Sequence, residues 1–349
     1  MGDLLVTKLN AAGTFLWAAS GGGPGSLSQA GSGIALDNAG NAYVTGSSNG
    51  PADFGPNVYL NNQYNEQEAL VAKIDAAGTW LWVARTPKPL GINSGAANGY
   101  DIAVDNSGNA YVTGFFSGTV GMFDTSRLTS QGSYDVFVAK LNPAGALQWA
   151  TRAGGIGLEV AQAIAVDAAD NVFITGYFGG RAAFGPFAVT GSGFTDAFVA
   201  RLNSSGTFVG AAASNNSQHC AGIDIAVGLS NATYVAGYFN GNSAQFGASS
   251  LTGSAYKRTG FVSRAGGLVL ATASQQPTSA LGLQVWPNPG SGAVSVTGNL
   301  PNQLIKVYNS LGQLVVSTTL PANGHLALKL PAGVYLVRSN ELCHRLVME

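Results

Sequence analysis

Residues 100–116 read YDIAVDNSGNAYVTGFF, and residues 134–150 read YDVFVAKLNPAGALQWA. Each stretch contains two short apolar runs, and the runs are separated by Asp, Asn, Ser, Pro and Gly. Short apolar runs with turn residues between them predict β-strands that are joined by tight turns. The two stretches together therefore predict a unit of four strands.

This unit recurs along roughly the first 270 residues of the 349-residue chain. The basic residue of the motif x-V-A-K-L-N recurs every 61 to 67 residues, at Lys8, Lys73, Lys140, Arg201 and Arg264. A second marker, the aspartate that ends the motif I-A-V-D, has the same period and falls at Asp37, Asp105 and Asp167. Two independent markers with one period identify a structural repeat.

Both faces of each four-stranded sheet are expected to be covered. In the strand that contains Val136 and Val138, the residues that face the other way, such as Phe137 and Ala139, are also apolar. A sheet with two apolar faces needs a partner on each side. Copies of the sheet that cover one another form the blades of a β-propeller. The sequence therefore predicts an all-β fold.

Propeller repeats are predicted over 1–272, as a half-blade at 3–19 and full blades at about 33–84, 100–150, 163–213 and 223–272. The half-blade matches only the last two strands of the repeat, and nothing after Thr272 supplies the missing pair. The ring is therefore expected not to close properly. The first residues also lack a basic region followed by an apolar stretch, which is the pattern of a signal peptide. Both observations predict that the chain is truncated.

The repeat pattern D-x-x-G-N-x-Y-V-T-G, followed by F-G and then D-x-F-V-A-K-L-N-x-x-G-x-x-x-W-A, resembles the SBBP β-propeller repeat of bacterial extracellular proteins. The resemblance covers roughly residues 3–272 and implies the fold, but no activity. The last copy departs from the pattern, because Gly228 replaces the aspartate and the tryptophan is missing.

The C-terminal part has a different composition. Residues 273–281 are expected to form a linker, and 282–349 offer about seven short strands, which suits a small Ig-like β-sandwich. This segment resembles the type A C-terminal sorting domain of the type IX (Por) secretion system of Bacteroidetes. The motif residues that carry the resemblance are Pro287, Asn288, Pro289, Tyr308, Gly312, Gly333 and Tyr335.

The resemblance to the sorting domain implies where the protein goes and what it meets. It implies that the type IX secretion machinery is a partner, and that the protein is exported to the extracellular space or the outer cell surface. It also implies removal of the tail, followed by release or by attachment to surface lipopolysaccharide.

Composition argues against several classes of function. The net charge is −1 and only 9% of residues are charged, so no basic face for nucleic acid is expected. No apolar run is long enough for a transmembrane segment. Cys220 and Cys343 lie far apart in the sequence and are expected to be isolated thiols.

The sequence offers no catalytic constellation, no metal site and no cofactor motif. Its three histidines are His219, His325 and His344, of which two lie in the C-terminal segment. The repeated aspartates are interpreted as turn caps rather than calcium ligands or catalytic acids. The repeated tryptophans are expected to pack between blades rather than to stack on sugars, and they are Trp17, Trp82 and Trp149.

Non-repeated loops are better candidates for a binding surface. Residues 56–68 read PNVYLNNQYNEQE, a composition that suits polar ligands such as glycans. The candidate binding residues there are Tyr59, Asn61, Asn62, Gln63, Tyr64 and Asn65. The stretch 86–100 and the pair Lys257-Arg258 also lie outside the repeat.

We expect a secreted or surface-displayed, non-catalytic binding or adhesion scaffold, with glycans or surface proteins as further partners. Two alternatives remain open at this stage. One is an extracellular enzyme that degrades polysaccharides or peptides, and the other is a purely structural surface component.

Overall fold

A computed structural model describes residues 2–348 except 24–27, 57, 61–66, 88–94, 124–125, 217, 229–231, 255–256, 266–283, 287–293, 298–303, 310–312, 320, 322–324 and 340–341. The chain divides into two compact units, Met1–Ala273 and Ser274–Glu349. Both units are built from antiparallel β-sheets.

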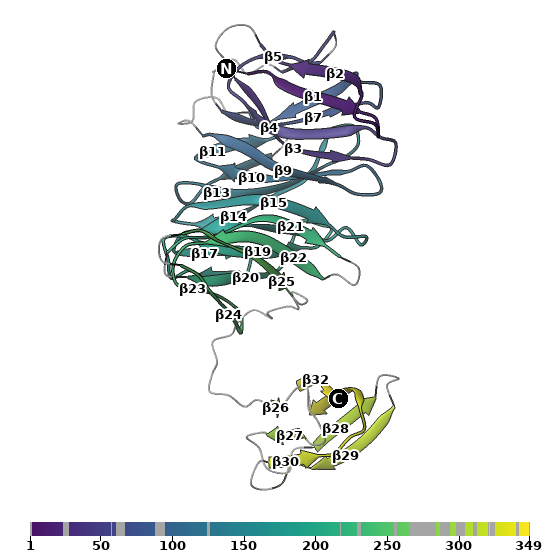
Figure 1. Cartoon of the computed structure of the whole chain (residues 1–349), viewed down its shortest axis with the longest axis vertical. Helices are drawn as coiled ribbons and strands as arrows, with labels where there is room; N and C mark the ends of the chain where they lie inside the picture. Colours follow the sequence, from purple (N-terminus) through teal and green to yellow (C-terminus); the bar gives the residue numbers. More distant parts are fainter. Residues whose placement is uncertain are drawn as a thin grey trace. The chain divides into compact units, whose positions relative to one another are not determined.

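Four sheets follow one another along the first unit, and we call them blades 1 to 4. Figure 1 shows them in chain order, with colours that run from purple to green. Blade 1 consists of β3 (Gln29–Leu36), β4 (Ala42–Ser48), β7 (Glu68–Ile74) and β8 (Trp80–Arg85). Blade 2 consists of β9 (Ala97–Val104), β10 (Ala110–Phe116), β13 (Asp135–Leu141) and β14 (Leu147–Gly155).

Blade 3 consists of β15 (Glu159–Val166), β16 (Val172–Phe178), β19 (Asp196–Leu202) and β20 (Phe208–Asn216). The described strands of blade 4 are β21 (Cys220–Val227), β22 (Thr233–Phe239) and β25 (Thr259–Ala265). The fourth strand predicted for this blade falls on residues outside the described part of the chain. The predicted half-blade is a pair of strands, β1 (Leu4–Leu9) and β2 (Phe15–Gly21). The all-β propeller fold is therefore confirmed, and no closed barrel forms among the described strands.

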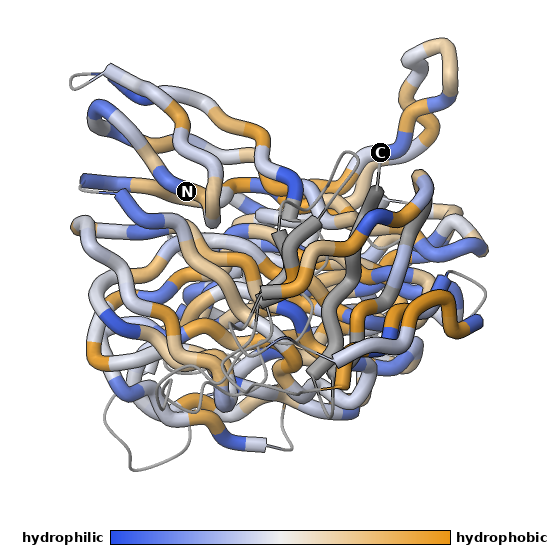
Figure 2. Tube along the Cα trace, turned by 90° about the horizontal axis from the view of Figure 1, so that it is seen from below, coloured by the Kyte–Doolittle hydropathy of each residue, from blue (hydrophilic) through white to orange (hydrophobic). Residues whose placement is uncertain are grey.

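Burial of both sheet faces explains why these residues form stacked sheets. All seven residues of β4 and of β7 are buried, because both faces of the strand meet apolar side chains. Blades 2 and 3 share a core cluster, in which Tyr111 and Val138 of one blade pack with Ile164 and Val172 of the next. Figure 2 shows hydrophobic segments along the strands and hydrophilic ones mainly at the connecting turns.

A glycine in the second strand of each blade lets two backbones approach closely. A Cβ atom on Gly46, Gly114, Gly176 or Gly237 would lie 1.8–2.1 Å from a carbonyl oxygen of the neighbouring first strand. This first strand also carries a β-bulge, and the extra residue is Ser32, Tyr100, Gln162 or Ile223. A bulge turns the extra side chain away from the regular alternation of the strand.

Hairpins link each blade to the one before it, which the sequence did not predict. β17 (Arg181–Phe184) and β18 (Phe187–Thr190) lie between the second and third strands of blade 3, yet β17 pairs with β14 of blade 2. In the same way β23 (Ser243–Phe246), which pairs with β24 (Ser249–Thr252), extends β20 of blade 3.

The corresponding hairpins of blades 1 and 2 contact the chain that follows the preceding outer strand. They are β5 (Ala52–Asp53) with β6 (Tyr59–Leu60), and β11 (Thr119–Met122) with β12 (Ser126–Thr129). Gly22 bridges to Asp53, and the Gly121 N–H donates to the Pro87 carbonyl over 2.7 Å. A hairpin occurs at the same place in each repeat. Neighbouring blades are therefore joined by backbone hydrogen bonds as well as by face-to-face packing.

The second unit contains two sheets. One is formed by β26 (Gln284–Trp286), β27 (Val294–Thr297) and β30 (His325–Leu328). The other is formed by β28 (Leu304–Asn309), β29 (Leu314–Thr319), β31 (Gly333–Ser339) and β32 (Leu342–Met348). Val296 and Leu328 of the first sheet share one core with Ile305 and Val337 of the second. The Ig-like assignment stays a prediction.

Candidate functional site

The repeated aspartates cap the turn between the first two strands of a blade, as predicted. Oδ1 of Asp105 accepts hydrogen bonds of 2.9 Å from the backbone N–H groups of Ser107 and Asn109, and Oδ2 accepts one of 2.8 Å from the Asn109 side chain. Asp37 and Asp167 bind their own turns in the same pattern. A carboxylate that is saturated by its own turn is a structural group.

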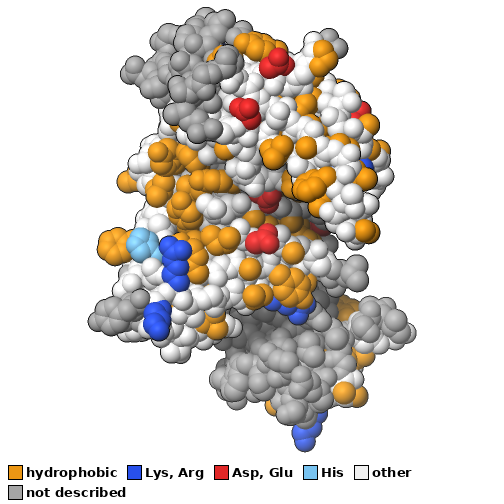
Figure 3. All heavy atoms as spheres, turned by 45° about the horizontal axis from the view of Figure 1, so that its top comes forward, with side chains coloured by type: hydrophobic (Ala, Val, Ile, Leu, Met, Phe, Trp, Pro, Cys, Tyr) orange, Lys and Arg blue, Asp and Glu red, His pale blue; other side chains and the backbone are white. Residues whose placement is uncertain are grey.

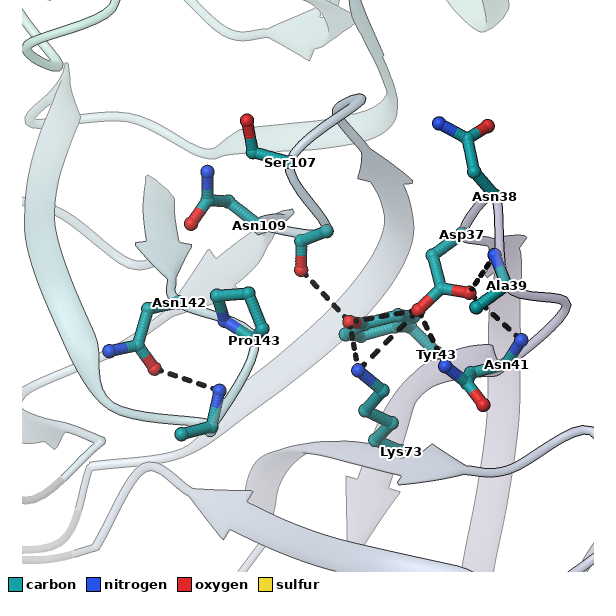
Figure 4. A network of polar contacts seen from close by, with 12 residues as sticks. Asp37, Asn38, Ala39, Asn41, Tyr43, Lys73, Ser107, Asn109, Asn142 and Pro143 are labelled. Carbon is teal, nitrogen blue, oxygen red and sulfur yellow. Dashed lines mark hydrogen bonds and ion pairs between the residues drawn. The ribbon is translucent and has the colours of Figure 1, made fainter.

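In blade 1 the turn aspartate, Asp37, also contacts a lysine and a tyrosine from the neighbouring strands (Figure 4). Nζ of Lys73 donates to the Tyr43 hydroxyl and lies 3.5 Å from the Asp37 carboxylate. The Tyr43 hydroxyl in turn donates to the Gly108 carbonyl of blade 2 over 2.9 Å. The network therefore ties blade 1 to the turn of blade 2, and we call it the turn network.

Blade 2 has an equivalent turn network, in which the Tyr111 hydroxyl donates to Asp105 and the Lys140 ammonium lies 3.7 Å from that carboxylate, and this network changes the acidity of its members. Burial disfavours the charged form of Asp105, but hydrogen bonds from the side chain and backbone of Asn109 outweigh burial and lower the pKa of Asp105. Burial, followed by the nearby charge of Asp105, raises the pKa of Tyr111. The acid is thus held charged and the phenol neutral, which suits a fixed scaffold.

The tryptophans pack between blades, as predicted. Nε1 of Trp149 donates to the Ser204 carbonyl in the next blade over 3.1 Å, and its ring covers Gly206 so closely that a Cβ there would lie 2.6 Å away. Trp17 and Trp82 cover Gly78 and Gly145 in the same way.

Blade 3 has no tryptophan at the corresponding place. Phe208 pairs with Leu202, whereas the tryptophan stands opposite the basic residue, as in the pair Trp149 and Lys140. The residue at that place in blade 3 is Gly210, opposite Arg201. The strand register therefore leaves this place in blade 3 without an aromatic side chain.

The predicted binding loop is described only in part. Tyr59 lies in the short strand β6 and is 61% exposed. Asn61, Asn62, Gln63, Tyr64 and Asn65 lie outside the described residues, so the loop stays a prediction.

The structure brings together a different set of aromatic side chains, which we call the aromatic row: Tyr100, Phe115, Tyr134, Tyr177 and Tyr238. Within blade 2 the ring of Phe115 lies 5.6 Å from that of Tyr100 and 4.6 Å from that of Tyr134. Burial raises the pKa of Tyr177, and Tyr100 and Tyr238 raise it further as neighbouring ionisable groups. The phenols of blades 2, 3 and 4 are thus neighbours.

Two features of the sequence place these rings side by side. Phe115, Tyr177 and Tyr238 occupy the same position of the repeat, directly after the second-strand glycine, where blade 1 has Ser47. Tyr100 is the extra residue of the bulge in β9. The sequence did not predict the row, because the repeat pattern does not show which rings of neighbouring strands and blades meet. Tyr100 does end a stretch that we noted as non-repeated.

The hydroxyl groups distinguish the aromatic row from the scaffold tyrosines. Tyr43 and Tyr111 are fully buried, and their hydroxyls bind within the turn network. The row tyrosines lie at the surface or are half-buried, and Tyr134 is 37% exposed. Among the described residues none of their four hydroxyls forms a hydrogen bond. The row therefore offers apolar ring faces together with free donors and acceptors.

Further exposed groups adjoin the same edge of the blades, where their first and third strands begin. The Arg258 guanidinium lies 4.3 Å from the centre of the Tyr238 ring. Phe194 lies just before β19 of blade 3 and is 74% exposed. Its ring stacks on that of His219, just before β21 of blade 4, with the ring centres 5.3 Å apart. Figure 3 shows a face on which hydrophobic side chains gather beside a histidine and basic side chains.

A buried pair of acids lies behind this edge. Asp135 accepts a hydrogen bond from Arg152, and Oε2 of Glu159 accepts one of 2.7 Å from the Gly155 N–H. Both carboxyl groups are fully buried, and Oε1 of Glu159 has no hydrogen-bond partner among the described residues. Burial raises the pKa of Glu159 to about 7; the Gly155 N–H opposes this, and the charge of Asp135 adds to it.

Other potentially reactive groups are dispersed. The described residues contain no group of three or more His, Cys, Asp or Glu side chains that could hold a metal ion. Cys220 is a buried free thiol, and burial raises its pKa. The side chain of Cys343 lies outside what the structure describes. No helix in the described part of the chain is long and apolar enough to cross a membrane.

The motif residues of the C-terminal unit have structural roles where they are described. The Tyr335 hydroxyl donates to the Pro331 carbonyl over 3.0 Å, which closes the motif P-A-G-V-Y onto itself. Asn309, next to Tyr308, accepts a hydrogen bond of 3.0 Å from the Gln313 N–H across the hairpin. Gly333 begins β31, whereas Pro287, Asn288, Pro289 and Gly312 lie outside the described residues.

Comparison with known families finds one match in each part of the chain. Residues 22–55 match the β-propeller repeat SBBP, and residues 284–346 match the secretion system C-terminal sorting domain. Both predicted resemblances are thereby confirmed. The chain carries an SBBP propeller repeat and the sorting domain that directs proteins to type IX secretion.

Two individual proteins are also similar. An uncharacterized WD repeat-containing protein of Acanthamoeba polyphaga mimivirus is 28% identical over 202 residues, which cover 50% of this chain and 14% of that protein. The chain thus spans about one seventh of the length of this curated relative. A solved structure of a protein of unknown function from Bacteroides caccae has 13% identity and a TM-score of 0.34, and the match covers 88% of this chain and 86% of that one.

Proposed function

We propose that this type IX secreted propeller protein is a non-catalytic binding protein, and that its ligand binds at the aromatic row. The sorting domain implies export to the extracellular space or the cell surface, where it would present the propeller to ligands. The observation that carries the proposal is the set of four free tyrosine hydroxyls on one edge of blades 2 to 4. Folding alone does not require tyrosine there, because Phe115 occupies the same position of the repeat.

The alternative function, an extracellular hydrolase, needs paired titratable groups that a substrate can reach. Asp135 and Glu159 form a pair of carboxyl groups near the row, but a substrate cannot reach them. Both groups are fully buried, and Asp135 accepts a hydrogen bond from Arg152. The reachable side chains of the row have ring faces and phenols. These features favour binding over hydrolysis, and over a surface component that has no ligand.

A retention assay tests the proposal. The purified full chain would be passed over an immobilised panel of neutral polysaccharides, acidic polysaccharides, mucin and gelatin. A variant with Tyr134→Ser, Tyr177→Ser and Tyr238→Ser would be compared with it. We expect at least one probe to retain the parent protein and to lose about tenfold or more of this retention with the variant. Tyr59→Ser tests the predicted loop at 59–65, and Tyr234→Ser, which removes a 42% exposed tyrosine outside the row, is the matched control.

The same assay distinguishes the alternatives. Release of reducing ends or free amines from any probe would overturn the non-catalytic assignment. Equal retention of the parent and the triple variant would contradict binding at the row. Loss of retention with Tyr59→Ser alone would instead assign binding to the loop at 59–65. Circular dichroism of each variant would show that the propeller is folded.

A further inference from the structure

We propose that the ligand of the aromatic row is a neutral oligosaccharide, bound along blades 2, 3 and 4 with its sugar rings on the row and its hydroxyls on the tyrosine hydroxyls. This inference depends on the proposed function, because it names the ligand class of the same site. It is drawn from the chemistry of the row, its periodicity and its charge.

The chemistry of the row suits a ligand that has both apolar faces and hydrogen-bonding groups. The Phe115 ring contacts Tyr100 and Tyr134 at 5.6 and 4.6 Å, so the three rings of blade 2 form a continuous apolar surface. A purely apolar ligand that covered it would bury the free hydroxyls without hydrogen-bond partners, which would weaken its binding. A sugar has C–H faces for the rings and hydroxyls for the phenols, so it satisfies both.

The periodicity of the row indicates a ligand with repeating units. Phe115, Tyr177 and Tyr238 stand at one position of three successive repeats, so each blade presents a ring in the same local setting. An oligosaccharide repeats one chemical unit in the same way. A peptide of mixed sequence has no such period, which is why we favour the glycan over a peptide.

The charge of the row indicates a neutral ligand. In the part of the chain that the structure describes, the cation that stacks on a ring of the row is Arg258, whose guanidinium lies over the Tyr238 face, 4.3 Å from the centre. Recognition of an acidic sugar needs several converging cationic donors, as in a bidentate arginine fork. The row offers tyrosine hydroxyls rather than several cationic donors.

Titration calorimetry of the full chain would test this inference, with oligosaccharides of two to six units from cellulose, xylan, laminarin and starch. We expect one neutral series to bind, with an affinity that rises about tenfold or more from two units to the length that spans three blades. Tyr177→Ser should lower the affinity for the longest member about five- to tenfold. Tyr177→Phe, which keeps the ring and loses the hydroxyl, should lower it by a smaller factor.

Three outcomes would overturn the inference. Row-dependent binding of gelatin without binding of any neutral series would leave the proposed function intact and reject the glycan. Tighter binding of an oligogalacturonate than of every neutral series would reject the neutral ligand. An affinity that does not depend on the number of sugar units would reject binding along three blades. Tyr234→Ser, which removes a 42% exposed tyrosine at the opposite end of β22 from Tyr238, is the matched control and should leave the affinity unchanged.

Discussion

The Asp105 carboxylate accepts four hydrogen bonds, from two backbone N–H groups, from Asn109 and from Tyr111, and it lies 3.7 Å from the Lys140 ammonium. Asp105→Ala would leave these donors and a largely buried cation without their acceptor. We expect the free energy of unfolding to fall by about 3 kcal/mol or more. Guanidinium denaturation of the full chain would measure the change.

Asp75 provides the matched control for Asp105. Its carboxylate caps an exposed turn by accepting hydrogen bonds from the Ala77 and Thr79 N–H groups, 2.9 Å each. Asp75→Ala removes a cap of the same kind outside the turn network, at an expected cost of about 1 kcal/mol. Equal losses in the two variants would show that the lysine and tyrosine add nothing to the cap.

The raised pKa of Glu159 predicts that the free energy of unfolding depends on pH. Burial raises its pKa to about 7, above the ordinary value of 4.5, so the folded protein binds this proton more tightly than the unfolded chain. The stabilising contribution of the protonated group is complete below pH 4.5 and is lost as the pH rises through about 7. The free energy of unfolding should fall over this range, and Glu159→Gln should flatten the fall. Gln29 occupies the same position in blade 1 and is 2% exposed, so glutamine fits there.

Denaturation curves at several pH values would measure the effect of Glu159. Asp135 and Arg152 are the charged groups beside it, and both remain in the variant. Curves for the parent and the variant that run parallel from pH 4.5 to above 7 would contradict the assignment of the titration to Glu159.

At the level of strands and turns, local chemistry made much of the fold predictable. The turn at Asp105 has its acceptor and its Gly-Asn pair within five residues, so the sequence specifies it without help from the rest of the chain. The apolar patterns of β10 and β13 likewise depend on near neighbours. These elements were predicted because their determinants are contiguous in sequence.

Contacts across long connections were not predictable. The pairing of β17 with β14 joins residues on either side of a whole strand hairpin, and its contact residues are Gly154, Gly155, Ala182 and Ala183. None of these residues has a side chain that specifies a partner. The aromatic row was missed for a similar reason, because bulges in the first strands determine which rings meet. Sequence gives the period of the array, whereas the register between strands gives its surface.

Gly206 tests the contact between a turn and the tryptophan of the preceding blade. It has φ of 80°, and a Cβ there would lie 2.6 Å from the Trp149 ring. Gly13 occupies the same place in the first turn of the chain with φ of 79°, but a Cβ there would meet no atom within 4 Å. Gly206→Ala and Gly13→Ala therefore share the strain of a positive φ, about 1 kcal/mol, and differ in the tryptophan contact.

We expect Gly206→Ala to destabilise the protein by about 1–3 kcal/mol more than Gly13→Ala, because the Trp149 ring must move. Denaturation would measure the difference, and tryptophan fluorescence would report the displaced ring. Gly145→Ala, which would meet Trp82 at 2.8 Å, should behave like Gly206→Ala. A loss as small as that of Gly13→Ala would show that the tryptophans do not hold the blades together.

Across the whole first unit, the cost of a substitution depends on which blade carries it. In a repeat array the stability is approximately a sum of the contributions of single repeats and of the contacts between neighbours. Ile34, Ile102, Ile164 and Ile225 occupy one position of the repeat. The last three are 4–6% exposed, whereas Ile34 is 58% exposed. The difference arises because the second strand of the preceding blade covers the other three, and β1 and β2 do not cover Ile34.

The contrast between Ile34 and Ile102 predicts two different results for one chemical change. Ile102→Ala should lower the free energy of unfolding by about 2–5 kcal/mol, since it removes a buried side chain and leaves a cavity. Ile34→Ala should change it by less than about 1 kcal/mol, because that side chain is mostly in solvent. Denaturation of the two variants of the full chain would measure both. A cost at Ile34 that equals the cost at Ile102 would mean that another surface covers this face of β3 in solution, and ultracentrifugation would then show whether that surface is a second copy of the chain.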